Sequence, residues 1–96
     1  MSYIFEQLKK TNPQAIILFG SAAKDEMSED SDLDILVIKE SKKPFLDRMR
    51  EIRGQIRTHT PIDLIVLTPN EAKEMPKKST FFRQIIEEGK LIYGRI

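Results

Sequence analysis

The chain has 96 residues, 40% of them hydrophobic and 32% charged, a balance typical of a small globular domain and not of a disordered segment. It has no cysteine and a single histidine, which excludes disulfides, thiolate metal sites and a histidine-rich zinc site. No run approaches the roughly 18 apolar residues of a membrane span, and the N-terminus lacks a signal-peptide pattern, so we expect one soluble, cytoplasmic domain over residues 1–96.

The first third of the chain predicts a helix and two buried strands. Residues 2–11 indicate a short helix, which the following Asn-Pro pair breaks. The run QAIILFG at 14–20 is continuously apolar and ends in glycine, which favours a buried strand. Residues 21–25 are compatible with one helical turn and 26–31 with a polar loop. The run DLDILVIK at 32–39 predicts the second buried strand.

A helix is expected after Pro44, because a proline suits the first turn. Four apolar residues then recur at helical spacing on one face: Phe45, Met49, Ile52 and Ile56. Gly54 weakens the end of this helix. Residues 39–57 carry seven basic and three acidic residues, a net charge of +4, whereas residues 1–38 carry three lysines and seven acids, a net charge of −4. We interpret the basic stretch as a solvated helix face, with no inference of DNA or RNA binding.

The last third predicts a strand, two helices and an edge strand. The run PIDLIVLT at 61–68 indicates a third buried strand. Residues 70–75 favour a short helix, and STFFRQIIEEG at 79–89 favours a longer one with Ser79 or Thr80 as its cap. The segment LIYG at 91–94 can add an edge strand. The fold class is therefore α/β, with helices flanking a small mixed sheet.

Two aspartates open the second strand, where charge is unfavourable. Because strand residues i and i+2 point to one face, the Cβ atoms of Asp32 and Asp34 lie roughly 6–7 Å apart, and both carboxylates can converge on one cation. Oxygen ligands suit Mg²⁺ or Mn²⁺. The four preceding acids are interpreted as a solvated loop: Asp25, Glu26, Glu29 and Asp30.

A third acid, Asp63, stands at the opening of the third strand. If strands 32–39 and 61–68 are parallel, both openings lie at one edge of the sheet, and Asp63 joins the other two acids. An antiparallel strand at 14–20 brings Gly20 and Ser21 to the same edge. A glycine there lets a phosphate approach the backbone, and the Ser21 hydroxyl can donate to a phosphate oxygen.

The segment FGSAAKDEMSEDSDLDILVI at 19–38 resembles the signature of the nucleotidyltransferase superfamily that includes DNA polymerase beta. The resemblance is strongest to the minimal nucleotidyltransferases, the antitoxin proteins of HEPN/MNT toxin–antitoxin pairs. The Asp63 strand and the closing FFRQIIEEGKLIYG also match that pattern, so the resemblance covers nearly the whole chain. It implies a polymerase-beta-like fold.

The resemblance also implies roles for individual residues. Asp32, Asp34 and Asp63 would be the catalytic metal ligands, with two Mg²⁺ ions expected, Mn²⁺ as the alternative, and Asp63 acting on the attacking hydroxyl. The phosphates of ATP would be held by Gly20 and Ser21. Lys24 stands where many relatives have arginine and would neutralise phosphate charge.

The function that the resemblance implies is transfer of AMP from ATP to a hydroxyl of a partner protein, a HEPN-type toxin. Larger relatives carry a helical domain for acceptor recognition, so we expect a second protein to supply it here. Two alternatives stay open: a non-catalytic, nucleotide-binding antitoxin that acts by contact, and a small-molecule nucleotidyltransferase. The sequence leaves open whether the chain forms an oligomer, and it gives no indication of a membrane partner. His59 is expected to lie in a surface loop.

Overall fold

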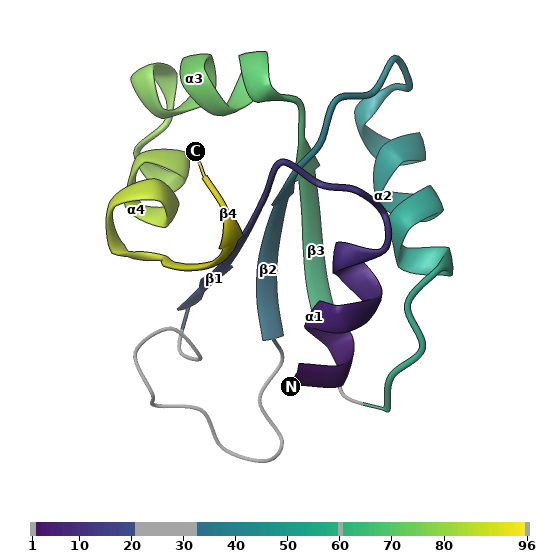
Figure 1. Cartoon of the computed structure of the whole chain (residues 1–96). Helices are drawn as coiled ribbons and strands as arrows, with labels where there is room; N and C mark the ends of the chain where they lie inside the picture. Colours follow the sequence, from purple (N-terminus) through teal and green to yellow (C-terminus); the bar gives the residue numbers. More distant parts are fainter. Residues whose placement is uncertain (1, 21–32, 60, 96) are drawn as a thin grey trace.

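The computed structural model of the protein describes residues 2–20, 33–59 and 61–95. The predictions for 21–25 and 26–31 lie outside these residues, as do Ser21, Lys24 and Asp32. In the described part, no helix is long and apolar enough to span a membrane. Its elements, in chain order (Figure 1), are α1 (Ser2–Lys9), β1 (Ala15–Phe19), β2 (Leu33–Ile38), α2 (Phe45–Gly54), β3 (Ile62–Leu67), α3 (Pro69–Lys78), α4 (Thr80–Glu88) and β4 (Lys90–Gly94).

The four strands form one mixed sheet in the order β3-β2-β1-β4. β2 and β3 are parallel, whereas β1 is antiparallel to both β2 and β4. The predicted mixed topology is therefore confirmed, including the parallel pair joined through α2 and the edge strand at the C-terminus. The end of β1 and the beginnings of β2 and β3 lie at the same edge of the sheet, at the bottom in Figure 1.

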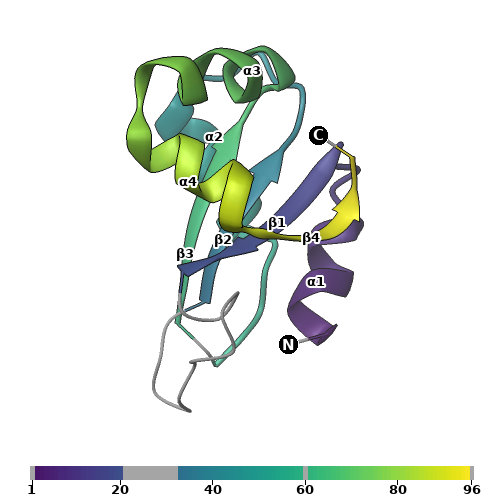
Figure 2. The same cartoon turned by 90° about the vertical axis from the view of Figure 1, so that its left-hand side faces the viewer.

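Helices cover both faces of this sheet, as Figures 1 and 2 show. Alternate residues of β2 point to opposite faces: Leu33, Ile35 and Val37 pack with α1 and α2, whereas Leu36 and Ile38 pack with α3 and α4. Burial on both faces explains why the strands are continuous apolar runs in the sequence. Asp34 falls on the same face as Leu36, the face that α4 covers.

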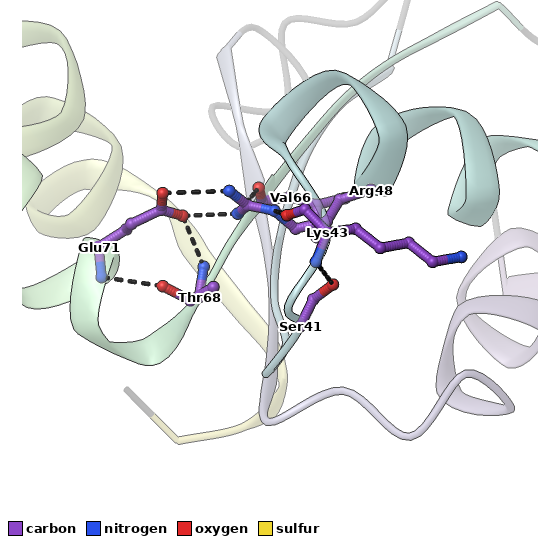
Figure 3. Close-up of polar contacts among 6 residues, drawn as sticks. All are labelled: Ser41, Lys43, Arg48, Val66, Thr68 and Glu71. Atoms are coloured by element: carbon purple, nitrogen blue, oxygen red, sulfur yellow. Dashed lines mark hydrogen bonds and ion pairs between the residues drawn. The ribbon is translucent and has the colours of Figure 1, made fainter.

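The helix face predicted for this segment differs from the structure at two positions. Ile52, and Ile56 just beyond the end of α2, are buried as expected, but Phe45 is 38% exposed and Arg48 is only 6% exposed. The Arg48 guanidinium is buried because each of its hydrogen-bonding sides has a partner. Nη1 donates to the Val66 carbonyl at 3.0 Å, and Nη1 and Nη2 donate to the Glu71 carboxylate at 2.5 and 3.1 Å (Figure 3). This ion pair ties α2 to β3 and α3 at the end of the sheet opposite the aspartates.

Helix α3 begins at Pro69 and is longer than the predicted 70–75. A capping box explains its start: the Glu71 amide donates to Thr68 Oγ1 at 3.2 Å, and the Thr68 amide donates to Glu71 Oε1 at 2.9 Å. The sequence TPNE at 68–71 carries the signal of this capping box. The Arg48 guanidinium beside Glu71 also holds the pKa of that carboxyl below its ordinary value.

Helix α4 is positioned by its two ends. Ser79 caps it, as predicted, by accepting a hydrogen bond from the Phe82 amide at 3.4 Å. At its other end, a Cβ on Gly89 would collide with the Ile85 carbonyl oxygen and with Ile17 of β1, so glycine allows the chain to pass this close to β1. The chain then pairs with β1 as β4, which lays α4 across the face of the sheet that carries Asp34.

Candidate active site

The centre of the candidate site is a row of three residues on adjacent strands. Phe19 of β1 is the partner of Asp34 in the antiparallel register, and Asp34 is the partner of Asp63 in the parallel register. Neighbouring strands lie about 4.8 Å apart, so the two carboxylate-bearing residues are side by side. The sheet thus brings Asp34 and Asp63 together, on the α4 face, at the edge where the sequence predicted a meeting of acids.

Gly20, directly after β1, lies against Asp34. Its φ of +72° is in the left-handed region, which favours glycine. A Cβ built on Gly20 would also collide with the Asp34 carboxylate. The positive φ favours glycine, and a larger residue would also displace the Asp34 carboxylate from its position against residue 20. The predicted antiparallel strand placed Gly20 at the edge of the aspartates, and the β1–β2 register confirms that placement.

A pocket of about 250 Å³ opens beside this row, between the sheet and α4. Its sheet side consists of Phe19, Gly20 and Asp34. The α4 side presents Phe81, Gln84, Ile85 and Glu88, with Gly89 behind them. The Phe81 ring is 51% exposed, and its edge-to-face contact with Phe19 has a centroid distance of 6.2 Å. The pocket therefore has an aromatic wall, one amide and two carboxylates.

Sequence reasoning missed most of the α4 side of this pocket. Phe81, Gln84 and Glu88 are not among the site residues that the sequence predicts. Their spacing of three and four residues puts them on one helical face with Ile85, and that pattern was readable. His59, predicted to be a surface residue, is exposed in the segment before β3.

Carboxylates of Asp34 and Asp63 are suitable ligands for a hard divalent cation. Their oxygens match the preference of Mg²⁺ or Mn²⁺, whereas the described residues offer no thiolate or histidine here for a zinc site. In the described ranges there is no group of three or more His, Asp or Glu residues around one point. Asp32, the third predicted ligand, lies outside those ranges and its role stays a prediction.

The polymerase beta nucleotidyltransferase family model matches residues 3–95. The chain belongs to this family. A candidate nucleotidyltransferase from Sulfolobus solfataricus has a similar structure, with a TM-score of 0.66 and 25% identity over 96% of this chain and 75% of that one. No curated protein matches the chain by sequence.

Two toxin–antitoxin structures share the fold of this nucleotidyltransferase family member. One contains AMP-PNP and has a TM-score of 0.61 at 20% identity, covering 98% of this chain and 73% of that one. The other, a mutant of the pair MntA–HpeT, has a TM-score of 0.58 at 18% identity over 98% and 72% of the two chains. The predicted polymerase-beta-like fold is confirmed by these likenesses.

Proposed function

We propose that this nucleotidyltransferase moves AMP from ATP to a hydroxyl group of a partner protein. The observation that carries the proposal is the in-register pair of Asp34 and Asp63, with the backbone of Gly20 against Asp34, in a chain of this family. Paired carboxylates on rigid neighbouring strands are the arrangement that metal-assisted phosphoryl chemistry requires. The pocket beside them is the place for the nucleotide.

In this proposal each residue has a separate task. Asp34 and Asp63, with Asp32, hold Mg²⁺, or Mn²⁺ as the alternative. Two such ions supply charge neutralisation at the attacking and leaving oxygens. The Gly20 backbone and Ser21 bind phosphate oxygens of ATP, and Lys24 adds a positive charge. Phe81 lines the pocket and offers an aromatic face to the nucleotide.

The reaction is an in-line displacement at the α-phosphorus. The acceptor oxygen forms a bond to that phosphorus while the bond to the bridging oxygen of the β-phosphate breaks, and pyrophosphate leaves. Asp63, on the outermost strand of the row, orients the attacking hydroxyl and accepts its proton. A covalent enzyme intermediate is not needed, so the chain's lack of cysteine does not restrict this chemistry.

The partner that we propose is a HEPN-type toxin, with this chain as its antitoxin. Support comes from the two toxin–antitoxin structures with the same fold, one of which contains AMP-PNP. The other carries two aspartate-to-glutamate changes two positions apart. Asp32 and Asp34 have that same spacing in this chain.

A second candidate is an antitoxin that acts by contact without catalysis. The exposed apolar side chains near the C-terminus favour it, since Phe81 is 51% and Leu91 is 47% exposed. Such surfaces are available for a protein partner. This candidate predicts that neutralisation of the partner survives the loss of the Asp34 carboxylate.

The experiment that separates the two is label transfer. The protein is incubated with its co-purified partner, Mg²⁺ and ATP labelled at either the α- or the γ-phosphate. Nucleotidyl transfer predicts protein-bound label from α-labelled ATP only, and its loss in Asp34→Asn. The matched control Asp47→Asn, an exposed aspartate on α2, should transfer normally. Absence of label from both forms, with the partner still bound, would favour the contact antitoxin.

A further inference from the structure

The outer edge of β3 has a part that is open to a partner strand. β3 is the last strand on its side of the described sheet. In a parallel pair, alternate residues of a strand bond to the neighbour. The Leu33 amide donates to the Pro61 carbonyl at 3.0 Å and the Lys39 amide donates to the Leu67 carbonyl at 2.9 Å, so the odd-numbered residues of β3 face β2. The backbone groups of Ile62, Leu64 and Val66 therefore point away from the sheet.

One end of this edge is already closed. Arg48 Nη1 donates to the outward Val66 carbonyl at 3.0 Å, which takes the place of a neighbouring strand. Ile62 and Leu64 instead border an open hollow of about 570 Å³ between α2 and β3. We call it the α2–β3 groove, and six of its lining residues matter here: Arg50, Arg53, Gly54, Ile62, Asp63 and Leu64. Figure 1 shows α2 alongside β3 at this side of the molecule.

The α2 side of the groove is positively charged. Within the described residues, neither Arg50 nor Arg53 is in an ion pair, and Arg53 Nη1 donates to the Ile56 carbonyl at 3.0 Å. Residues 39–57 carry seven basic and three acidic residues, a net charge of +4. The groove thus combines two arginines with an open strand edge, and it ends at Asp63.

We infer that the α2–β3 groove docks an extended, acidic segment of the acceptor protein, an inference that rests on the proposed function. Its backbone pairs with Ile62 and Leu64, its acidic side chains contact Arg50 and Arg53, and its hydroxyl reaches Asp63. A peptide fits this edge better than a nucleic acid does, because a strand edge presents alternating N–H and C=O groups that only another peptide backbone complements.

This placement also suits the proposed reaction. The nucleotide pocket lies between the sheet and α4, whereas the groove lies beside α2, which packs on the other face. Asp34 lines the first and Asp63 lines the second, and these two residues are partners in the β2–β3 register. Because both carboxylates lie on the α4 face, the acceptor hydroxyl reaches Asp63 around the outer edge of β3, whereas the nucleotide reaches Asp34 from the pocket beside α4.

Fluorescence anisotropy of labelled peptides tests the inference. The probe has about six residues, a central tyrosine and alternating glutamate and valine. One comparison peptide replaces glutamate with lysine, and another carries N-methylated amides. The full chain should bind the acidic probe at least about tenfold more tightly than either comparison. Equal affinities, or tighter binding of a single-stranded oligonucleotide of matched charge, would overturn the inference.

Substitutions then locate the binding. Arg50→Gln with Arg53→Gln should weaken binding of the acidic probe at least about tenfold. The matched control Lys73→Gln with Arg83→Gln removes the same charge from α3 and α4, outside the groove, and should leave binding within about twofold. Equal losses in the two double variants would mean that only net charge matters, which contradicts a specific groove.

A blocking variant separates this inference from the proposed function. Gly54 lines the groove, and a Cβ there would have no heavy atom within 4 Å, so Gly54→Phe adds a ring at the groove wall without a clash at Cβ, and its thermal unfolding is compared with that of the wild type. It should abolish both probe binding and AMP transfer while the affinity for a fluorescent ATP analogue is unchanged. If Gly54→Phe transfers AMP as well as the wild type, the groove is not the docking site, although the proposed function is unaffected. If the probe binds in the groove but the wild type transfers no AMP, the docking site is supported and the proposed function is wrong.

Discussion

Asp34 and Asp63 are direct partners on parallel neighbouring strands, one on β2 and the other on β3. Their strands are packed on both faces, which fixes the backbone of both residues. The proposed reaction would use this pair to hold a divalent cation, because carboxylate oxygens on neighbouring strands can converge on one ion.

Gly20→Ala should impair both the fold and the proposed chemistry. Alanine at a φ of +72° costs about 1–2 kcal/mol, and its Cβ collides with the Asp34 carboxylate. Thermal unfolding and AMP transfer measure the two effects. Gly54→Ala is the control, because Gly54 is helical and has open space around it, so it should stabilise by up to about 1 kcal/mol. A Gly20→Ala variant with the stability and activity of the wild type would contradict the claim that the Asp34 carboxylate packs closely against residue 20.

Glu71→Ala should be the more damaging of two glutamate substitutions on α3. It leaves the buried Arg48 guanidinium without its carboxylate and removes half of the capping box, for a loss of about 2–4 kcal/mol in unfolding free energy. Glu74→Ala removes only an exposed pair with Lys77 and should cost less than about 0.5 kcal/mol. Urea denaturation at neutral pH compares them, and equal losses would contradict the assigned role of Arg48.

The same ion pair predicts how stability depends on pH. Because Arg48 lowers the pKa of Glu71 below its ordinary value, the unfolded chain protonates Glu71 before the folded chain does as pH falls. Its contribution is therefore complete above the unfolded pKa and is lost as pH falls through the folded pKa. Wild-type protein should lose unfolding free energy more steeply than Glu71→Gln as pH falls below about 5. Parallel pH profiles of the two proteins would contradict this linkage.

Phe81→Ala should weaken nucleotide binding while leaving the fold intact. The ring lines the pocket beside Asp34 yet is half exposed, so its removal exposes little core. If it stacks on the nucleotide, the KM for ATP should rise at least about fivefold, with a small change in thermal stability. Phe45→Ala, an exposed phenylalanine on α2, is the control and should leave that KM unchanged. An unchanged KM for ATP in both variants would contradict the claim that Phe81 contacts the nucleotide.

Much of the fold was predictable because its strands are buried on both faces and form unbroken apolar runs. The meeting of Asp34 with Asp63 followed from topology, since two parallel strands that each open with an acid must place those acids at one edge. The buried Arg48 was not predictable from periodicity, because its burial depends on Glu71 in another helix. The α4 wall of the pocket likewise depends on how α4 crosses β1.

The most direct test of the central claim is a Mn²⁺ titration followed by electron paramagnetic resonance, with ATP present and without any acceptor. Wild-type protein and Asp47→Asn should bind Mn²⁺ equally. Asp34→Asn and Asp63→Asn should each weaken binding at least about tenfold, and the double variant should lose little more than either one, because both carboxylates serve one site. Undiminished Mn²⁺ affinity in both single variants would contradict the claim that Asp34 and Asp63 together form a metal site.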